Sequence, residues 1–144
     1  MADIIIDTPN RLWLGDMEAR QDEKFLRDNN IKVIFNITTI KFKKHEQIEY
    51  YQIPLSDSDS PSSIKKFVNH INIIDIINEK LKDHNILVHC EMGMQRSAAI
   101  IAAYLIKYHK MNIDDSITHI TTRRPKAFKH RVTFLEALYK VSYY

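Results

Sequence analysis

Residues 97–106 (SAAIIAAYLI) carry no charged side chain, so the helix that they predict is apolar on almost every side. Such a helix must be covered all round by other elements, which places it in the middle of a domain. The apolar run Ala98–Ile106 is about half as long as the roughly 20 residues of a membrane-spanning helix, so we expect no membrane span. With 144 residues, 44% of them hydrophobic, the chain suits one domain, and we expect residues 1–144 to form it.

Four segments of the chain predict strands. Ile31–Thr38 (IKVIFNIT) and Asn85–His89 (NILVH) are nearly continuous in apolar residues, as expected of strands that are covered on both faces. Ile48–Leu55 (IEYYQIPL) predicts a further strand, and Arg11–Leu14 predicts a short one that ends at Gly15.

Helical patterns alternate with these strands. Ser60 provides a capping hydroxyl and Pro61 suits the first helical position, and the apolar spacing that follows predicts a helix to about Lys82. Three further helices are predicted, over Glu18–Asn29, from Asn112 to a point before Pro125, and over Thr133–Val141. The alternation predicts an α/β fold with helices on both faces of a sheet.

The composition limits the setting of the protein. The first ten residues lack the basic and apolar segments of a signal peptide, and Cys90, the only cysteine, cannot form an internal disulfide. The chain has no Cys/His spacing typical of a metal site, and its net charge of +3 gives no argument for a nucleic-acid partner. We expect a soluble, cytoplasmic protein without a metal or other cofactor.

The loop between the Asn85–His89 strand and the apolar helix can bind an anion. Cys90 ends the strand and Ser97 begins the helix, so the loop must wrap round a point near the helix axis. Its backbone N–H groups and the positive end of the helix dipole favour a tetrahedral anion there. Gly93 permits a tight turn, and the planar guanidinium of Arg96 can hold two phosphate oxygens.

The same surroundings favour a reactive Cys90. Thiolates are stabilised at helix N-termini and beside cations, and an ionised sulfur on the floor of an anion site is a nucleophile aimed at phosphorus. The alternative is a small buried cysteine with no chemical role. The strand, the glycine in the loop, the hydroxyl after Arg96 and the helix together favour the nucleophile.

The nine residues HCEMGMQRS resemble the signature loop of the cysteine-dependent protein phosphatases, His-Cys-x5-Arg-Ser/Thr. Other stretches resemble the dual-specificity branch of that family: RLWLGDMEARQDEKFLRDNNIKVIFNIT, YYQIPLSDSDSPSSIKKF, AAYLIKYHKMNIDDSITHITTRRP and FLEAL. KAFKHRV departs from the Pro-Asn that the family often has at that place. The resemblance covers nearly the whole chain and implies a minimal catalytic core with a five-stranded mixed sheet flanked by helices.

The resemblance also implies roles for the residues of this loop. Cys90 would be the nucleophile, and the hydroxyl of Ser97 would donate to the sulfur when the thiolate leaves, although Ser97 also suits a helix cap. His89 is interpreted as fixing the shape of the loop rather than acting as a base. The phosphate-binding residues would be Glu91, Met92, Gly93, Met94, Gln95 and Arg96.

Two carboxylates compete for the role of general acid. In the resembling family the acid lies four residues after a strand isoleucine, and Ile53 plus four gives Asp57. Asp59 directly precedes the predicted helix cap Ser60, where a carboxylate also has a structural use. We therefore predict that Asp57 is the acid.

Taken together, these residues predict a metal-independent protein phosphatase that acts on phosphotyrosine and phosphoserine/phosphothreonine in phosphorylated proteins. An RNA 5′-triphosphatase and a non-catalytic phosphopeptide-binding module are the alternatives. A phosphoinositide phosphatase is disfavoured because the loop has no lysine and presents Glu91. The sequence leaves open whether Arg123 and Arg124 contact substrate or only end a helix, and the simplest interpretation of Lys41, Lys43 and Lys44 is a solvated loop.

Overall fold

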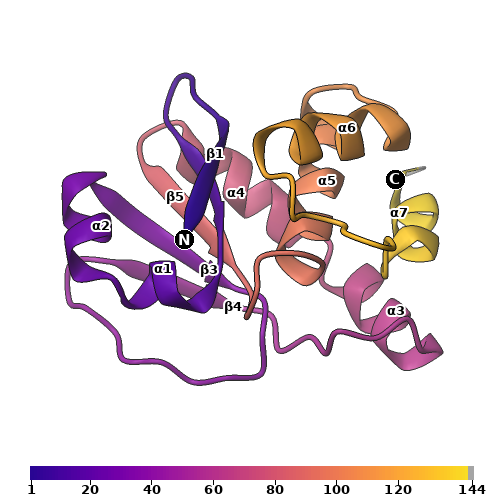
Figure 1. Cartoon of the computed structure of the whole chain (residues 1–144), viewed down its shortest axis with the longest axis horizontal. Coiled ribbons are helices and arrows are strands. Elements are labelled where there is room, and N and C mark those ends of the chain that lie inside the picture. Colours follow the sequence, from indigo (N-terminus) through magenta and orange to yellow (C-terminus); the bar gives the residue numbers. More distant parts are fainter. Residues whose placement is uncertain (143–144) are drawn as a thin grey trace.

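The computed structural model describes residues 1–142 and contains a five-stranded sheet with strand order β1-β2-β5-β3-β4 (Figure 1). The outer strand β1 runs antiparallel to β2, and the pairs β2–β5, β5–β3 and β3–β4 are parallel. The strands are β1 (Ala2–Ile6), β2 (Leu12–Gly15), β3 (Ile31–Asn36), β4 (Glu49–Gln52) and β5 (Asn85–His89). The predicted α/β fold with a mixed sheet is confirmed.

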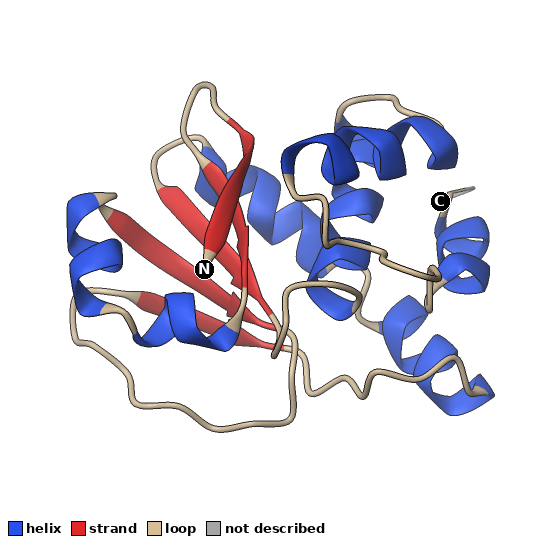
Figure 2. Cartoon of the chain, in the orientation of Figure 1, coloured by secondary structure: helices blue, strands red, loops and turns tan. Residues whose placement is uncertain are grey.

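Helices cover both faces of the sheet (Figure 2). On one face, Ala19 of the first helix and Leu26 of the second pack with Ile34 and Leu87 of the central strands. The larger core lies on the other face, where α5 contacts β2, β5, α4, α6 and α7. The helices are α1 (Met17–Gln21), α2 (Glu23–Asp28), α3 (Pro61–Asn69), α4 (Ile73–Leu81), α5 (Arg96–Tyr108), α6 (Ile113–Arg123) and α7 (Leu135–Val141).

The central helix is α5, as its apolar composition predicts. Every residue from Arg96 to Leu105 is buried. Within residues 1–142, no helix combines the length and the apolar character that crossing a membrane requires.

Two of the helices predicted from the sequence are each divided into two shorter helices in the structure, because a capping side chain or a turn interrupts them. The predicted helix Glu18–Asn29 is broken at Asp22, which is extended; its side chain accepts from the Phe25 N–H and its own N–H donates to the Ala19 carbonyl. It therefore caps α1 and α2 at once. The helix predicted from Ser60 to about Lys82 is broken at His70, whose N–H donates to carbonyls of the last turn of α3. Ser60 caps α3 as predicted.

The sheet also differs in detail from the prediction. Strand β1 has the sequence ADIII and is not among the predicted strands. Its three consecutive isoleucines do not alternate with polar residues, and they suit a strand that helix α6 covers. Strand β4 ends at Gln52, short of the predicted Leu55, and the last helix begins at Leu135 rather than Thr133. These differences lie in the two outer strands of the sheet and at the start of the last helix.

Candidate active site

The four parallel strands end at one edge of the sheet. Gly15 and Asn36 are both in register with His89, and Asn36 is in register with Gln52. Loops that follow parallel strands therefore meet at this edge, which is where open α/β sheets bind ligands. The loop from Cys90 to Gln95 leaves β5 here and enters the buried helix α5 (Figure 1).

Cys90 lies at the start of this loop and is 2% exposed. The hydroxyl of Ser97, in the first turn of α5, donates to the Cys90 sulfur at 3.1 Å. The pair that the sequence places seven residues apart is thus in direct contact.

The carbonyl groups of the loop all point away from its centre. The carbonyl of Glu91 accepts from the Met17 N–H at 3.0 Å, and the carbonyl of Met94 accepts from the Phe128 N–H at 2.8 Å. Those of Met92 and Gly93 accept from the Arg124 guanidinium at 3.1 and 2.8 Å. Within residues 1–142, no N–H group from Glu91 to Gln95 donates a hydrogen bond. The loop therefore presents a row of free donors, which suits an oxyanion.

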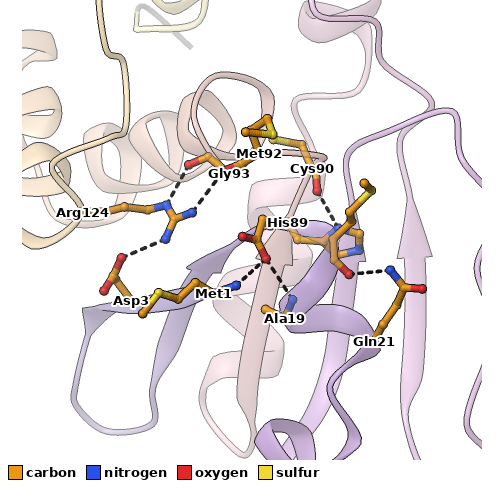
Figure 3. A network of polar contacts seen from close by, with 11 residues as sticks. Met1, Asp3, Ala19, Gln21, His89, Cys90, Met92, Gly93 and Arg124 are labelled. Atoms are coloured by element: carbon orange, nitrogen blue, oxygen red, sulfur yellow. Dashed lines mark hydrogen bonds and ion pairs between the residues drawn. The ribbon is translucent and has the colours of Figure 1, made fainter.

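The Arg124 side chain supports this loop by hydrogen bonds to the carbonyls of Met92 and Gly93 (Figure 3). Its side chain is 1% exposed; Nε donates to the Gly93 carbonyl at 2.8 Å, and Nη1 pairs with the Asp3 carboxylate at 2.8 Å. Arg123, its neighbour, is exposed and donates to the His119 carbonyl of its own helix. Of the two arginines that the sequence could not tell apart, Arg124 supports the loop and Arg123 ends the helix.

His89 lies beneath the loop and is fully buried. Burial lowers its pKa from 6.5 to about 4, so the ring is neutral at physiological pH. Its Nε2 lies 3.3 Å from Nη1 of Arg20, and its Nδ1 lies 3.1 Å from the Cys90 carbonyl. Because arginine can only donate, Nε2 accepts and Nδ1–H donates to the carbonyl. Both ring nitrogens are occupied, which favours the interpretation that His89 fixes the loop.

Arg96 joins the loop to the segment that carries the candidate acids. Its Nη1 donates to the Leu55 carbonyl at 3.0 Å, and its Nη2 lies 3.3 Å from Oε1 of Glu91. The Arg96 side chain is 9% exposed, and the Glu91 side chain is 46% exposed. A carboxylate of the loop itself therefore contacts the Arg96 guanidinium.

Gln95 ties the end of the loop to the segment that precedes α7. Its side chain donates to the Arg131 carbonyl at 2.7 Å and accepts from the Thr133 N–H at 3.0 Å. This segment includes the KAFKHRV stretch in which the chain departs from the family pattern, and Phe128 in it also bonds the loop. The departure therefore lies directly against the site.

Asp57 and Asp59 are both exposed but differ in their contacts. The carboxylate of Asp59 pairs with Arg131 at 3.1 Å. Within residues 1–142, the Asp57 side chain makes no hydrogen bond, and it lies two residues after Leu55, whose carbonyl is bonded to Arg96. Asp57 is thus the carboxylate that is free to serve another group.

Sequence patterns miss two residues that support the site, Arg20 and Asp3, and leave the role of a third, Arg124, open. Arg20, Asp3 and Arg124 act through contacts with residues 69, 121 and 31 positions away in the chain. Asp3 lies on β1, which is not among the predicted strands, and Arg20 lies in α1, where no sequence motif marks it. The patterns of helix and strand identify apolar faces and do not report which polar side chains are buried.

Comparison with known proteins identifies relatives of the chain. The profile of the family described as "Dual specificity phosphatase, catalytic domain" matches residues 12–143. Human "Dual specificity protein phosphatase 18" is 30% identical over 118 residues, which cover 79% of this chain and 60% of that protein. "Dual specificity protein phosphatase Mpk3" of Drosophila melanogaster is 31% identical over 120 residues, which cover 81% of this chain and 29% of that protein. The chain thus spans less than two thirds of the length of these relatives.

Solved structures show the same architecture. The crystal structure of DUSP15 is 28% identical, has a TM-score of 0.79, and is matched over 92% of this chain and 83% of that one. Human tyrosine phosphatase-like serine/threonine/tyrosine-interacting protein, 21% identical, shares the fold with a TM-score of 0.81 over 96% of this chain and 93% of that one. Since the family profile also matches nearly the whole length, the chain belongs to the dual specificity phosphatase catalytic-domain family.

Proposed function

We propose that this chain is a metal-independent protein phosphatase that hydrolyses phosphotyrosine and phosphoserine or phosphothreonine through a phosphocysteine intermediate. The observation that carries the proposal is the loop after β5, whose carbonyls are bonded outward and whose N–H groups are free beside the Cys90 sulfur. A row of free donors at the start of a helix binds the oxygens of a phosphate. The nucleophile then lies in line with the phosphorus.

In the first step the Cys90 thiolate attacks phosphorus while the bond to the leaving oxygen breaks. The loop amides and the Arg96 guanidinium hold the three equatorial oxygens, where positioning and charge stabilisation supply most of the rate. Asp57, in its protonated form, gives its proton to the leaving alkoxide or phenolate. The products are the free hydroxyl of the substrate, the phosphocysteine and an Asp57 carboxylate.

In the second step water attacks the phosphocysteine. The Asp57 carboxylate takes a proton from the water, the sulfur–phosphorus bond breaks, and inorganic phosphate forms. The Ser97 hydroxyl, 3.1 Å from the sulfur, stabilises the departing thiolate by donating to it. The cycle returns Asp57 to its acid form and Cys90 to its thiolate.

A bound phosphate would replace Glu91 at the Arg96 guanidinium. Nη2 of Arg96 now contacts Glu91, whereas Nη1 contacts the Leu55 carbonyl. The tie to Leu55 keeps the segment that carries Asp57 close to the loop, so the acid and the nucleophile belong to one connected site. We infer a reducing, cytoplasmic compartment for this enzyme, because the mechanism needs Cys90 as a free thiolate.

One assay tests this function against its alternatives. Phosphate release is measured, with EDTA present, from phosphotyrosine and phosphothreonine peptides, a phosphoinositide and an RNA 5′-triphosphate. Release from the phosphopeptides in EDTA is the expected result. Release from RNA alone would establish the triphosphatase, and tight peptide binding without release would establish a phosphopeptide-binding module.

A further inference from the structure

A small cavity is lined by residues of α1, of the ends of β3 and β4, and of the segment that joins these two strands. Figure 1 shows this segment as a long loop beside α1 and α2. Its volume is about 90 Å³. Three cationic and three aromatic side chains line it: Arg20, Lys41, Lys44, Phe42, Tyr50 and Tyr51. No carboxylate is among the lining residues.

Arg20 is the buried cation of this cavity and is 5% exposed. Its Cζ lies 4.7 Å from the ring centroids of both Phe42 and Tyr50. Stacking uses the face of a guanidinium and leaves the N–H groups on its edge for hydrogen bonds. One of these groups meets His89 Nε2 at 3.3 Å, and another meets the Lys43 carbonyl at a long 3.4 Å.

Within residues 1–142, no carboxylate lies within 4.0 Å of the Arg20 guanidinium. Burying a charge without a counter-ion is costly, so the Arg20 guanidinium would be stabilised by an anion that binds beside it. Glu49, on the neighbouring strand, does not supply the partner, since it pairs with Lys80 at 2.9 Å and accepts from the Tyr51 hydroxyl.

The walls of the cavity are held in place. Near β3, the Asn36 side chain donates to the Ile40 carbonyl at 2.9 Å, and the Gln52 side chain donates to the Thr38 carbonyl at 2.9 Å. At the far end of the segment, the Tyr50 hydroxyl accepts from the His45 N–H at 2.8 Å. The stretch that carries Lys41 and Lys44 is therefore anchored on both sides, which lowers the entropic cost of binding.

The cavity is connected to the catalytic loop. Arg20 contacts His89, and His89 precedes Cys90 and bonds its carbonyl. Asn36 and Gln52, which also line the cavity, are the last residues of β3 and β4, and Asn36 is in register with His89. A peptide whose phosphorylated residue enters the Cys90 loop can therefore extend along this edge to the cavity.

We propose that this cavity is a subsite for an anionic group that the protein substrate carries near its phosphorylated residue, either the carboxylate of an Asp or Glu or a second phosphate. A volume of about 90 Å³ exceeds the roughly 30 Å³ share of one water and suits such a group. The edge of the Arg20 guanidinium would hold the anion, and Lys41 and Lys44 would attract it. The inference rests on the proposed function, because it assumes a phosphorylated protein as substrate.

The test compares matched phosphotyrosine peptides. One set carries a single Glu at each of the four positions on either side of the phosphotyrosine, a second carries Gln, and a third carries phosphothreonine there. We expect kcat/KM to be about tenfold higher for the best anionic peptide than for its Gln counterpart at low salt, the size of one charged hydrogen-bonded contact. The first and third sets distinguish a carboxylate from a second phosphate, and the second set is the neutral control for both.

Variants assign the preference to the cavity. K41Q/K44Q should reduce the preference to about twofold or less and leave the rate on a small aryl phosphate unchanged. K110Q/K140Q, which removes two exposed lysines beyond the far end of α5 and on α7, should retain the full preference. R20M should also lose the preference, and its rate on the aryl phosphate is measured separately because Arg20 contacts His89.

The inference is overturned if the wild-type enzyme hydrolyses anionic and Gln peptides equally, or if K41Q/K44Q keeps the preference. Either result with normal turnover of the aryl phosphate leaves the proposed function intact. Absence of any turnover of the aryl phosphate would instead overturn the proposed function itself.

Discussion

The guanidinium of Arg124 lies where a side chain of residue 93 would have to be. A Cβ on Gly93 would lie 2.7 Å from Arg124 Nη2 and 2.6 Å from the Gly15 carbonyl oxygen, and the residue has φ of +66°. Arg124 Nε instead donates to the Gly93 carbonyl at 2.8 Å. The lack of a side chain at Gly93 therefore makes room for the buried Arg124 guanidinium. Together the glycine and the guanidinium keep the loop N–H groups turned toward the proposed phosphate site.

Replacement of Arg124 by Met should destabilise the protein and weaken phosphate binding. The carbonyls of Met92 and Gly93 lose their donors, and Asp3, which is 39% exposed, loses its partner. We expect a loss of about 2 kcal/mol in the free energy of unfolding and a rise in KM of about tenfold or more. Urea unfolding and steady-state kinetics measure the two effects. Arg123→Met, at the exposed neighbour, should change both by little, and equal effects of the two variants would contradict the assignment.

Replacement of Cys90 by Ser should abolish turnover and preserve binding. The serine hydroxyl is a poor nucleophile at neutral pH, whereas the free N–H groups of the loop remain. The rate should fall by at least about 10³-fold, and the Kd of phosphate or vanadate, measured by calorimetry, should change by less than about threefold. Normal turnover by Cys90→Ser would rule out the phosphocysteine mechanism.

Replacement of Asp57 by Asn should give a loss that depends on the leaving group. An aliphatic alkoxide needs a proton more than a phenolate does, because tyrosine has a pKa of about 10. We expect kcat/KM to fall by about 10²- to 10³-fold for phosphothreonine, less for phosphotyrosine, and little for an aryl phosphate with a very acidic phenol.

Asp59→Asn is the matched control for this prediction. It removes an exposed pair with Arg131 and should cost about 0.5 kcal/mol of stability or less, with near-normal kinetics. The graded pattern in Asp59→Asn would reverse the assignment of the acid, and equal losses for all leaving groups in Asp57→Asn would mean that Asp57 only shapes its loop.

Replacement of Glu91 by Gln should improve substrate binding. The carboxylate of Glu91 now lies 3.3 Å from Arg96 Nη2, which the phosphate must take over, and its charge repels a dianion. The KM for an aryl phosphate should fall by about two- to threefold, the effect of one partly exposed ion pair, with little change in kcat. Glu136→Gln, at an exposed position of α7, serves as control. An increase in KM would show that Glu91 assists binding.

The buried neutral His89 should make the protein sensitive to mild acid. Its pKa is about 4 in the folded protein and 6.5 in the absence of burial, so between these values the unfolded chain holds a proton that the native state lacks. The stabilising contribution is fully present above about pH 6.5 and is lost as the pH falls through about 4, up to about 3 kcal/mol.

Urea unfolding at pH 7 and pH 4.5 measures this effect. From pH 7 to 4.5, the wild-type protein should lose about 2 kcal/mol more than His89→Asn. Asp16 and Asp75, whose pKa values are lowered mainly by hydrogen bonds and nearby cations, lose their contributions at lower pH and do not obscure the comparison. Identical pH dependence in the two proteins would show that His89 is not the titrating group.

The sequence determined by itself the elements with strong apolar patterns and the loop between two of them. Ile31–Thr38 and Asn85–His89 are nearly continuous in apolar residues, and the helix after Arg96 is apolar on almost every side, so the burial of these elements follows from the local sequence. Because Cys90 and Ser97 flank one short loop between such elements, their proximity was predictable from local spacing. The division of the predicted helices was not predictable from the sequence, because a polar residue such as Asp22 ends a helix only when its backbone takes an extended conformation.

Only the tertiary structure decided which polar residues support that loop. The sequence does not distinguish Arg123 from its neighbour Arg124. Because α6 ends between them, the Arg124 side chain is buried against Gly93 and the Arg123 side chain lies in solvent. Arg20 lies in the short helix α1 and becomes a buried cation only because residues of β4 and of the connection between β3 and β4 pack over it. Burial of a charge depends on contacts between distant segments, and apolar periodicity carries no information about them.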